Sequence, residues 1–387
     1  MRHIYLEELC DINIGKTPSR SNPRYWNGSN KWLAISDMKS RNLNQTKECI
    51  TDLAIQECNM KMVPKGTVLM SFKLSIGKLG ITRDDIFTNE AIASFKIINE
   101  DILERNYLYY ALQTINYKKV AEKAVKGSTL NKAKLKKIMI PLPSFQAQQK
   151  IADTLDLASE IIEKRKEQIA EMDKLIQSVF YEIFGDPNKL SKEWKVNLKE
   201  VANITTGNTP SRKELENYGN HMEWIKTDNM TFDSLYPSRA AEYLSEIGVN
   251  KARIADKESI LMTCIAGSKK SIGKVVLLDR AVAFNQQINA ITVNGNIHVK
   301  YLFYILKFSK VRLEDFANDS MKKMITKSKL ETFEINNVDM KRQLEFTSIV
   351  EEIESQKKVM EESLHEMENN FNALMQKAFR GDLFPEE

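Results

Sequence analysis

Two segments of the chain repeat an apolar or small residue every three or four positions. The first begins at Ile151 and continues through Leu155, Ala158, Ile162, Ile169, Met172, Ile176, Val179 and Ile183. The second runs through Phe346, Ile349, Ile353, Met360, Leu364, Met367, Phe371, Leu374 and Ala378. Alternating steps of three and four residues are typical of helices that bury one stripe against a partner helix. Two prolines precede the first segment and Gly185 ends it, so we predict long helices over residues 144–185 and 339–380.

The apolar stripes of these helices need partners, because a single helix cannot bury its own stripe. The simplest arrangement is that each stripe covers the other. The two halves of the chain also repeat one another, so an approximate two-fold relation pairs the equivalent helices antiparallel. We therefore predict an antiparallel coiled coil with the remaining parts of the two halves at its opposite ends.

The repeat is visible in matched blocks that occur in the same order. The block Gly15–Arg20 (GKTPSR) matches Gly207–Arg212 (GNTPSR) at an offset of 192 residues, and Trp32 matches Trp224 at the same offset. After a four-residue insertion in the second copy, Ser75–Lys78 matches Ser271–Lys274 at an offset of 196. A period this long indicates a duplicated domain rather than a solenoid repeat. We call residues 1–143 the first module and residues 186–338 the second module.

Each module carries short strand patterns followed by one helical stretch. The predicted strands are Thr67–Phe72, Ala91–Ile98, Ile260–Cys264 and Ile288–Val293. The helical stretches are residues 107–112 and 301–306. No strand–helix–strand alternation is present, which argues against a doubly wound parallel sheet. We expect an α+β fold, with two similar domains separated by two long helices.

Charge alternates in step with this division. Residues 1–143 carry a formal charge of +9 and residues 186–338 carry +5, whereas residues 144–185 carry −3 and residues 339–387 carry −6. A basic face is expected of a protein that binds the phosphate backbone of nucleic acid, although an ordinary solvated surface can also be basic. The four cysteines show no metal-ligand spacing, and no apolar run is long enough for a membrane helix. We expect reduced thiols and a cytoplasmic protein.

Polar residues recur at turn-rich positions in both copies, and we predict that they contact DNA. In the first module they are Lys16, Thr17, Ser19, Arg20, Arg24, Ser36, Asp37, Lys39, Lys73, Ser75, Lys78, Asn89 and Glu90. In the second module they are Thr209, Ser211, Arg212, Lys213, Lys226, Asp228, Asn229, Lys269, Lys270, Ser271, Lys274, Asn285, Gln286 and Gln287. Such side chains position phosphates or read base edges. Each of them singly is also explained by turn and cap chemistry.

A basic stretch late in the first module is a candidate for non-specific attraction to phosphates. It includes Lys126, Lys132 and Lys134. The alternative is an amphipathic helix with a solvated face. For Trp32 and Trp224 we favour packing in the module cores over stacking on bases.

Two motifs suggest catalysis but lack the required context. Gly267–Lys274 (GSKKSIGK) has one residue too many between its glycines for a phosphate-binding loop and continues with Val275. Asn22–Tyr25 (NPRY) resembles a catalytic motif of adenine methyltransferases, but no glycine-rich cofactor loop accompanies it. We therefore predict a chain that is not an enzyme and binds no metal or cofactor.

These blocks, taken in order, resemble the specificity subunits of type I restriction–modification enzymes over almost the whole chain. The resemblance rests on the TPSR turn, the tryptophan block, VLMS…SIGK, Asn285–Gln287, and a proline-led helix ending in LMQKAF. The first copy departs from the family pattern at Asn89-Glu90-Ala91.

The resemblance implies a division of labour in a larger complex. Residues 1–143 and 186–338 would be target recognition domains that each read one half of a split, asymmetric DNA sequence. The helices would act as a ruler for the unread spacer. Two methyltransferase subunits would supply chemistry with S-adenosylmethionine, and motor–nuclease restriction subunits would join them. The alternatives from the residues are a coiled-coil scaffold whose globular ends bind protein partners, and a nucleotide-dependent enzyme that uses Gly267–Lys274.

Overall fold

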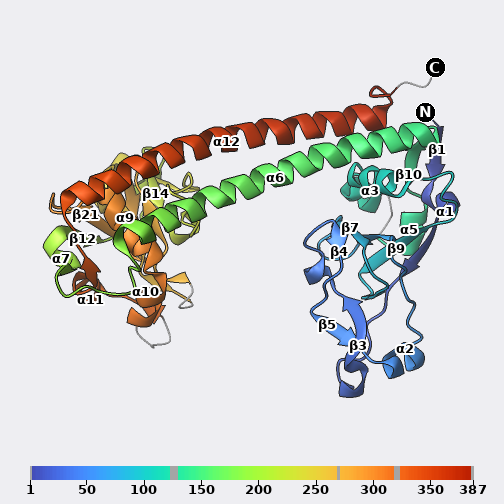
Figure 1. Cartoon of the computed structure of the whole chain (residues 1–387), viewed down its shortest axis with the longest axis horizontal. Coiled ribbons are helices and arrows are strands. Elements are labelled where there is room, and N and C mark those ends of the chain that lie inside the picture. The colour runs from blue at the N-terminus through green and yellow to red at the C-terminus, as the bar shows by residue number, and fades with distance from the viewer. Residues whose placement is uncertain (1, 123–129, 268–270, 318–322, 385–387) are drawn as a thin grey trace. The chain divides into compact units, whose positions relative to one another are not determined.

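The computed structural model describes residues 2–122, 130–267, 271–317 and 323–384 (Figure 1). Its contacts form two compact units, one of Met1–Lys166 with Glu362–Glu387 and one of Glu167–Glu361. Each unit therefore contains one module and a part of both long helices.

The first unit is a mixed module of short strands and helices. Its strands are β1 (Arg2–Tyr5), β2 (Cys10–Ile14), β3 (Trp26–Leu33), β4 (Asn42–Leu43), β5 (Glu48–Ile50), β6 (Val68–Ser71), β7 (Leu79–Thr82), β8 (Phe87–Thr88), β9 (Ile92–Ile97) and β10 (Met139–Leu142). Its helices are α1 (Leu6–Leu9), α2 (Asp52–Glu57), α3 (Arg105–Gln113), α4 (Tyr117–Glu122) and α5 (Lys132–Lys136), with 3-10 turns η1 (Pro23–Tyr25) and η2 (Ile35–Asp37).

Three sheets organise this module. The largest has the order β2-β9-β6-β7-β4, the second has the order β5-β3-β8, and β1 pairs with β10. The strands β6 and β9 form its antiparallel centre, in the register Val68 to Phe95 and Met70 to Ala93. These strands form because their side chains are apolar or small, and all four residues of β6 are buried. The core lies between this sheet and α3, where Tyr107 and Leu108 are fully buried.

The second unit repeats the design. Its strands are β11 (Lys195–Asn197), β12 (Ala202–Thr206), β13 (Tyr218–Gly219), β14 (Met222–Ile225), β15 (Tyr243–Leu244), β16 (Ile254–Ala255), β17 (Ile260–Thr263), β18 (Ile265–Ala266), β19 (Val275–Leu277), β20 (Val282–Phe284), β21 (Ile288–Val293), β22 (Lys323–Met324) and β23 (Glu334–Asn336). Its helices are α7 (Leu198–Val201), α8 (Glu246–Asn250), α9 (Val299–Phe308), α10 (Lys310–Phe316) and α11 (Lys327–Glu331), with 3-10 turns η3 (Leu215–Asn217) and η4 (Thr227–Asn229). Its sheet β12-β21-β17-β19 corresponds to β2-β9-β6-β7 of the first module. The predicted α+β architecture is confirmed, and the predicted strands and helical stretches form β6, β9, β17, β21, α3 and α9.

The long helices are α6 (Phe145–Phe184) and α12 (Met340–Arg380). In the first unit, Ile151 and Leu155 of α6 share a core with Met375 and Ala378 of α12, and Lys166 pairs with Glu368 at 3.2 Å. The two helices therefore run antiparallel within this unit, because later residues of α6 meet earlier residues of α12.

The second unit has the same antiparallel arrangement. Phe184 of α6 lies against Phe346 of α12, with ring centroids 5.4 Å apart, and Asp173 pairs with Lys357 at 2.7 Å. The buried stripe of α12 differs from the predicted one at two places, and one of them is near its C-terminal end, where Met375 is buried and the predicted Leu374 is only partly buried. Ile349 is 42% exposed and Val350 is fully buried, so the stripe runs through Phe346, Val350 and Ile353. Ile349 and Val350 are both apolar, so residue type alone could not decide whether the buried stripe continues three or four residues after Phe346.

A buried glutamine joins the start of each long helix to its module. Gln148 is 0% exposed, accepts a hydrogen bond from the Glu104 N–H at 2.9 Å, and donates to the Pro143 and Ile102 carbonyls. Gln343 of α12 accepts from the His298 N–H at 2.7 Å and donates to the Val338 carbonyl. Each amide is satisfied on both its oxygen and its nitrogen, so the helix start is held in a fixed position on its module.

A tyrosine–carboxylate contact continues this attachment along each helix. The Tyr110 hydroxyl of α3 donates to Asp156 of α6 at 2.7 Å. The Tyr304 hydroxyl of α9 donates to Glu354 of α12 at 2.8 Å. The two tyrosines correspond in the repeat, although Asp156 lies eight residues after Gln148 and Glu354 lies eleven residues after Gln343. Each long helix is therefore docked on its own module by the same chemistry, from carboxylates about one turn apart.

Within the part of the chain that the structure describes, no helix has both the length and the apolar character needed to cross a bilayer. Cys10 and Cys264 are buried free thiols, and burial raises the pKa of each to about 12. Cys49 and Cys58 are free and partly exposed.

Candidate nucleic-acid interface

Four loop segments of the first module come together beyond the ends of its strands. They are residues 16–20, 36–39, 73–78 and 89–90. The Thr17 hydroxyl donates to the Glu90 carboxylate, and the Lys16 N–H donates to the Thr88 carbonyl at 2.9 Å. The Lys78 ammonium lies 3.4 Å from the Ile35 carbonyl, beside the second segment. These contacts join residues far apart in the sequence into one polar surface, which we call the first loop cluster.

The second module assembles its corresponding segments through the same contacts. The Thr209 hydroxyl donates to the Gln286 side-chain oxygen, as Thr17 does to Glu90. The Asn208 N–H donates to the Phe284 carbonyl at 3.1 Å. Position 90 and its counterpart 286 therefore share a structural role, although one carries a carboxylate and the other an amide. The hydrogen bond from Thr17 lowers the pKa of Glu90, so this residue presents an ionised acceptor.

In both modules an arginine lies over an aromatic ring and is held by a glutamate. The Arg20 guanidinium lies 3.9 Å from the Trp26 ring centroid and donates two hydrogen bonds to Glu48. Arg212 lies 5.1 Å from the ring centroid of Tyr218, which corresponds to Trp26 at the offset of 192, and donates to Glu242 at 2.8 Å.

These ion pairs lower the pKa of each glutamate. The hydrogen bond from Arg20 dominates at Glu48, and those from Lys226 and then Arg212 dominate at Glu242. Both arginines are thus held in a defined orientation. Sequence reasoning missed the two glutamates, because their offset is 194 rather than 192 and no motif surrounds them.

The two tryptophans that match between the modules, Trp32 and Trp224, are core residues, which confirms the interpretation drawn from the sequence. Trp32 is 1% exposed and Trp224 is 3% exposed. The Trp32 indole N–H donates to the Lys16 carbonyl at 3.0 Å, and that of Trp224 donates to the Asn208 carbonyl at 3.3 Å. Each tryptophan therefore holds the residue that precedes the TPSR turn against the module core.

Several candidates use their side chains to shape turns. Asp37 accepts from the Ala34 N–H at 3.1 Å, and Asn229 accepts from the Lys226 N–H at 3.0 Å. Asn89 and Asn285 each accept from the N–H two residues later, at 3.1 Å. At each of these four positions one side-chain oxygen accepts the hydrogen bond that shapes the turn. A DNA contact would therefore use the other polar atoms of the side chain.

The other candidates divide by exposure. Those with an exposed side chain are Lys16, Ser19, Arg20, Arg24, Ser36, Lys39, Lys73, Ser75, Lys78, Glu90, Lys132, Thr209, Ser211, Arg212, Lys213, Asp228 and Gln286. Those partly buried are Thr17, Asp37, Asn89, Lys134, Lys226, Asn229, Ser271, Lys274 and Gln287, and Asn285 is buried. Lys126, Lys269 and Lys270 lie outside the described residues. Lys132 and Lys134 belong to α5, which packs on α1 and β2 rather than forming part of the loop cluster.

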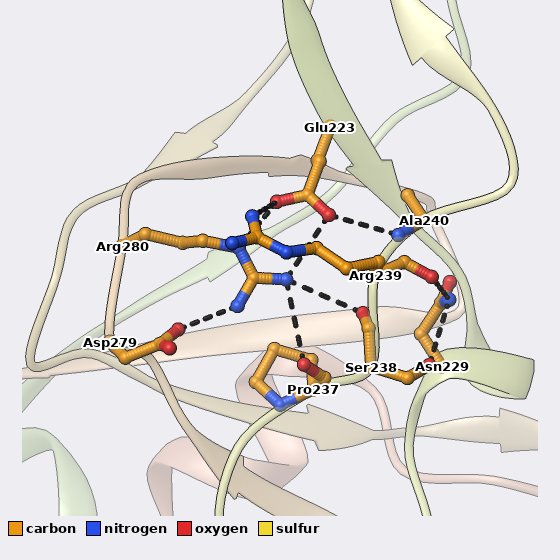
Figure 2. Close-up of polar contacts among 8 residues, drawn as sticks. All are labelled: Glu223, Asn229, Pro237, Ser238, Arg239, Ala240, Asp279 and Arg280. Carbon is orange, nitrogen blue, oxygen red and sulfur yellow. Dashed lines mark hydrogen bonds and ion pairs between the residues drawn. The ribbon is translucent and has the colours of Figure 1, made fainter.

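A buried carboxylate fixes a loop of the second module against β14, as Figure 2 shows. Glu223 of β14 is 7% exposed and accepts hydrogen bonds from Arg280, from Arg239 at 3.2 Å, and from the Ala240 N–H at 2.9 Å. Arg280 also reaches the Pro237 and Ser238 carbonyls. Asn229 then donates to the Ser238 hydroxyl and the Arg239 carbonyl. The network fixes residues 237–240 against β14.

The first module has an ion pair at the corresponding positions with its charges exchanged, and its side chains are more exposed, at 40% for Lys31 and 47% for Asp84. The offsets of 192 and 196 place Lys31 and Asp84 where the second module has Glu223 and Arg280. Lys31 forms an ion pair with Asp84 and donates to the Asn44 carbonyl at 2.8 Å. In each module the cation of the pair also donates to a backbone carbonyl in the loop after the strand that carries the first residue of the pair. Lys31 donates to Asn44 after β3, and Arg280 donates to Pro237 and Ser238 after β14. Comparison of the two copies missed this pair, because the matched positions carry residues of opposite charge and so do not appear as identical residues.

No metal site accompanies these residues. Among the residues that the structure describes, no group of three or more His, Cys, Asp or Glu side chains is placed to hold a metal ion.

The comparisons with known proteins agree with the repeat. A family model described as type I restriction modification DNA specificity domain matches residues 3–171 and again residues 191–369. One curated relative is the type I restriction enzyme MjaIX specificity subunit of Methanocaldococcus jannaschii, 24% identical over 280 residues. That match covers 66% of this chain and 64% of the relative, so it spans less than two thirds of the relative's length. The HindI specificity subunit of Haemophilus influenzae is 26% identical over 178 residues, covering 43% of this chain and 38% of the relative.

Solved structures show the same fold over nearly the whole chain. A chain from a structure on the assembly and conformational transition of the type I R-M system has a TM-score of 0.61 and 18% identity, covering 99% of this chain and 98% of that one. The type I restriction–modification S subunit of M. genitalium has a TM-score of 0.54 and 16% identity, covering 98% and 96%.

Proposed function

The chain belongs to the family of type I restriction modification DNA specificity proteins, and from this membership we propose that it selects the DNA target of a restriction–modification complex. In this proposal the chain is not itself catalytic. Its two modules each recognise one half of a split, asymmetric sequence, and the complex acts in the cytoplasm.

The observation that carries the proposal is the presence of equivalent loop clusters in the two modules. Each cluster joins a TPSR turn, a tryptophan-anchored turn and an Asn-containing turn through corresponding hydrogen bonds. Their exposed side chains combine cations suited to phosphates with groups that read base edges. Two similar surfaces on one chain match a target with two separate parts. A scaffold that binds protein at both ends would leave the basic charge of both modules without a role.

The proposal includes partners that carry out the chemistry. Two methyltransferase subunits bind the chain along its long helices and hold S-adenosylmethionine, and motor–nuclease restriction subunits join that assembly. The acidic charge of the helical segments, −3 and −6, differs from the basic charge of the modules and suits a different partner from DNA. The helices then serve as a ruler for the distance between half-sites.

Binding to DNA by the assembled chain tests this function. The full chain is mixed with the methyltransferase subunits of its system and titrated with duplexes of random sequence, and the retained DNA is sequenced. We expect enrichment of two short motifs at a constant separation. Enrichment of a single uninterrupted motif, or retention of DNA without any motif, would reject the proposal.

Glu90→Gln is expected to change base preference in one half-site without changing the fold. The hydrogen bond from Thr17 persists, because Gln286 accepts the corresponding bond in the second module. A carboxylate accepts from the amino group of cytosine, whereas an amide pairs with adenine, and such a contact discriminates by about 1–3 kcal/mol. We expect cytosine to be replaced by adenine at one position in the selected sequences. An unchanged motif would place Glu90 outside base recognition.

Lys132→Ala is expected to weaken binding to all sequences equally. Lys132 is exposed at the first turn of α5 and belongs to the basic stretch. Loss of one phosphate contact reduces the slope of log affinity against log salt by about 1. The measurement is a salt titration of specific and random duplexes. A loss confined to the specific duplex would show that Lys132 reads bases instead.

A further inference from the structure

Leu74 has the most exposed side chain among the large apolar residues of the described chain. It is 94% exposed and stands at the tip of the turn between β6 and β7. Its φ of +58° lies in the left-handed region, which is unfavourable for a residue with a branched side chain. A leucine that is both fully exposed and in an unfavourable backbone conformation does not contribute to the stability of the fold.

The turn that carries Leu74 is held firmly at its base. Ser71 is fully buried, and its hydroxyl donates to the Ser75 carbonyl and accepts from the Lys78 N–H at 3.0 Å. The Gly77 N–H donates to the Ser71 carbonyl at 2.9 Å, which closes the turn. The backbone around Leu74 is therefore defined, and the side chain is directed into solvent by the turn itself.

The tip belongs to the first loop cluster. Lys73 is exposed and lies close enough to Glu90 to lower its pKa, although Thr17 contributes more to that shift. Lys78 reaches the Ile35 carbonyl at 3.4 Å, and Gly77 lies beside Tyr117 of α4. Leu74 and Ile76, which is 40% exposed, are thus apolar groups within an otherwise basic and polar surface, and Leu74 is the more exposed of the two. If this surface faces the phosphate backbone, the leucine projects between the phosphate-binding cations.

The shape of the turn and the chemistry of the grooves identify the contact. The major groove of B-DNA admits a two-stranded β-ribbon, whereas the minor groove is about half as wide. In the major groove the apolar group on a base edge is the C5-methyl of thymine. We propose that Leu74 contacts the C5-methyl group of a thymine in the half-site read by the first module. This inference rests on the proposed function and adds a specificity-determining residue to it.

The second module offers an internal comparison. The second module carries its four-residue insertion, Gly267–Lys270, directly before Ser271, the counterpart of Ser75, so the offsets place no matched residue opposite Leu74. We therefore expect the dependence on a thymine methyl through this position to be confined to one half-site.

Replacement of thymine by uracil in the target tests the contact. Uracil lacks the methyl group and keeps every hydrogen-bonding group, so the substitution isolates the apolar term. The full chain with its methyltransferase subunits is titrated with duplexes in which each thymine of both half-sites is replaced in turn. We expect about a fourfold loss of affinity at one thymine, as follows from burial of one methyl group at about 0.8 kcal/mol.

The variant Leu74→Asn links that loss to this side chain. Asparagine tolerates a positive φ, so the turn is expected to persist and the unfolding midpoint to stay unchanged. With Leu74→Asn, uracil and thymine should bind equally at the position that was sensitive in the wild type. Ile98→Asn is the matched control, because Ile98 is 62% exposed, lies outside the loop cluster and should leave the thymine preference intact.

The outcomes separate this inference from the proposed function. Equal affinity for uracil and thymine at every position of the wild-type target overturns the inference and leaves recognition of a two-part target untouched. The same conclusion follows if Leu74→Asn keeps the wild-type thymine preference. Absence of any sequence-specific duplex rejects the proposed function itself.

Discussion

The variant Glu223→Ala is expected to lower the free energy of unfolding of the second unit by about 3 kcal/mol, the lower end of the range for breaking a buried ion pair. Glu223 is 7% exposed and accepts hydrogen bonds from two arginines and one backbone N–H. Its removal leaves Arg280, whose side chain is 20% exposed, with only the more exposed Asp279 as a counter-charge. The measurement is chemical denaturation, read as a shift in midpoint at constant slope.

An exchange of charges provides the matched control. Glu223→Lys alone places two cations together, and Arg280→Asp alone places two carboxylates together, so each single variant should be strongly destabilised. The double variant recreates the arrangement of Lys31 and Asp84 in the first module and should recover much of the loss. If the double variant is no more stable than the less stable of the two single variants, the pair is not coupled.

The stability that Glu223 contributes is expected to depend on pH. Burial tends to raise the pKa of Glu223, but hydrogen bonds from Arg280 and the Ala240 N–H outweigh it, so its pKa is lowered from 4.5. A lowered pKa in the folded state means that the stabilisation is present above pH 4.5 and is lost as the pH falls through the folded value. The difference in stability between wild type and Glu223→Ala should therefore shrink in acid.

Insertion of one heptad into both long helices is expected to lengthen the unread spacer of the DNA target. The insertions are placed after Lys166 in α6 and after Glu361 in α12, where the chain passes between the two units. Seven residues add about 10 Å of helix at 1.5 Å per residue. At 3.4 Å per base pair, this is the length of about three base pairs. Sequencing of methylated or selected DNA gives the spacer directly.

A heptad inserted into α6 alone is the control for this change. A single insertion shifts the stripe of α6 past that of α12 and separates pairs such as Asp173 and Lys357. We expect this variant to lose stability and not to change the spacer in a regular way. If the paired insertion folds normally and leaves the spacer unchanged, the helices do not set the distance between half-sites.

The long helices and central strands were predictable because their signals are local and repeated. A seam sustained over many turns identifies a helix even when one residue, such as Ile349, is assigned to the wrong side. The buried runs of β6 and β17 were visible for the same reason. In contrast, the choice between Ile349 and Val350 depends on the packing of α12 in the second unit.

The candidate interface could be predicted in outline but not in detail. The repeat located the segments around Thr17 and Thr209, because both copies kept the same turn residues. It could not show that Asp37 and Asn229 shape their turns, since the same side chains suit base recognition. It also missed Glu48, Glu242 and the exchanged pair of Lys31 and Asp84, which depend on contacts across the fold. Leu74 was passed over because only the polar residues of its turn were considered as DNA contacts.

Mapping of methylated bases in whole cells tests the central claim most directly. Genomic DNA from cells that carry this chain with its methyltransferase partners is compared with DNA from otherwise identical cells that lack the chain. We predict methylation at two short motifs separated by an unread spacer of constant length, and its complete loss without the chain. Methylation that persists in the absence of the chain, or that follows one continuous motif, would contradict the account.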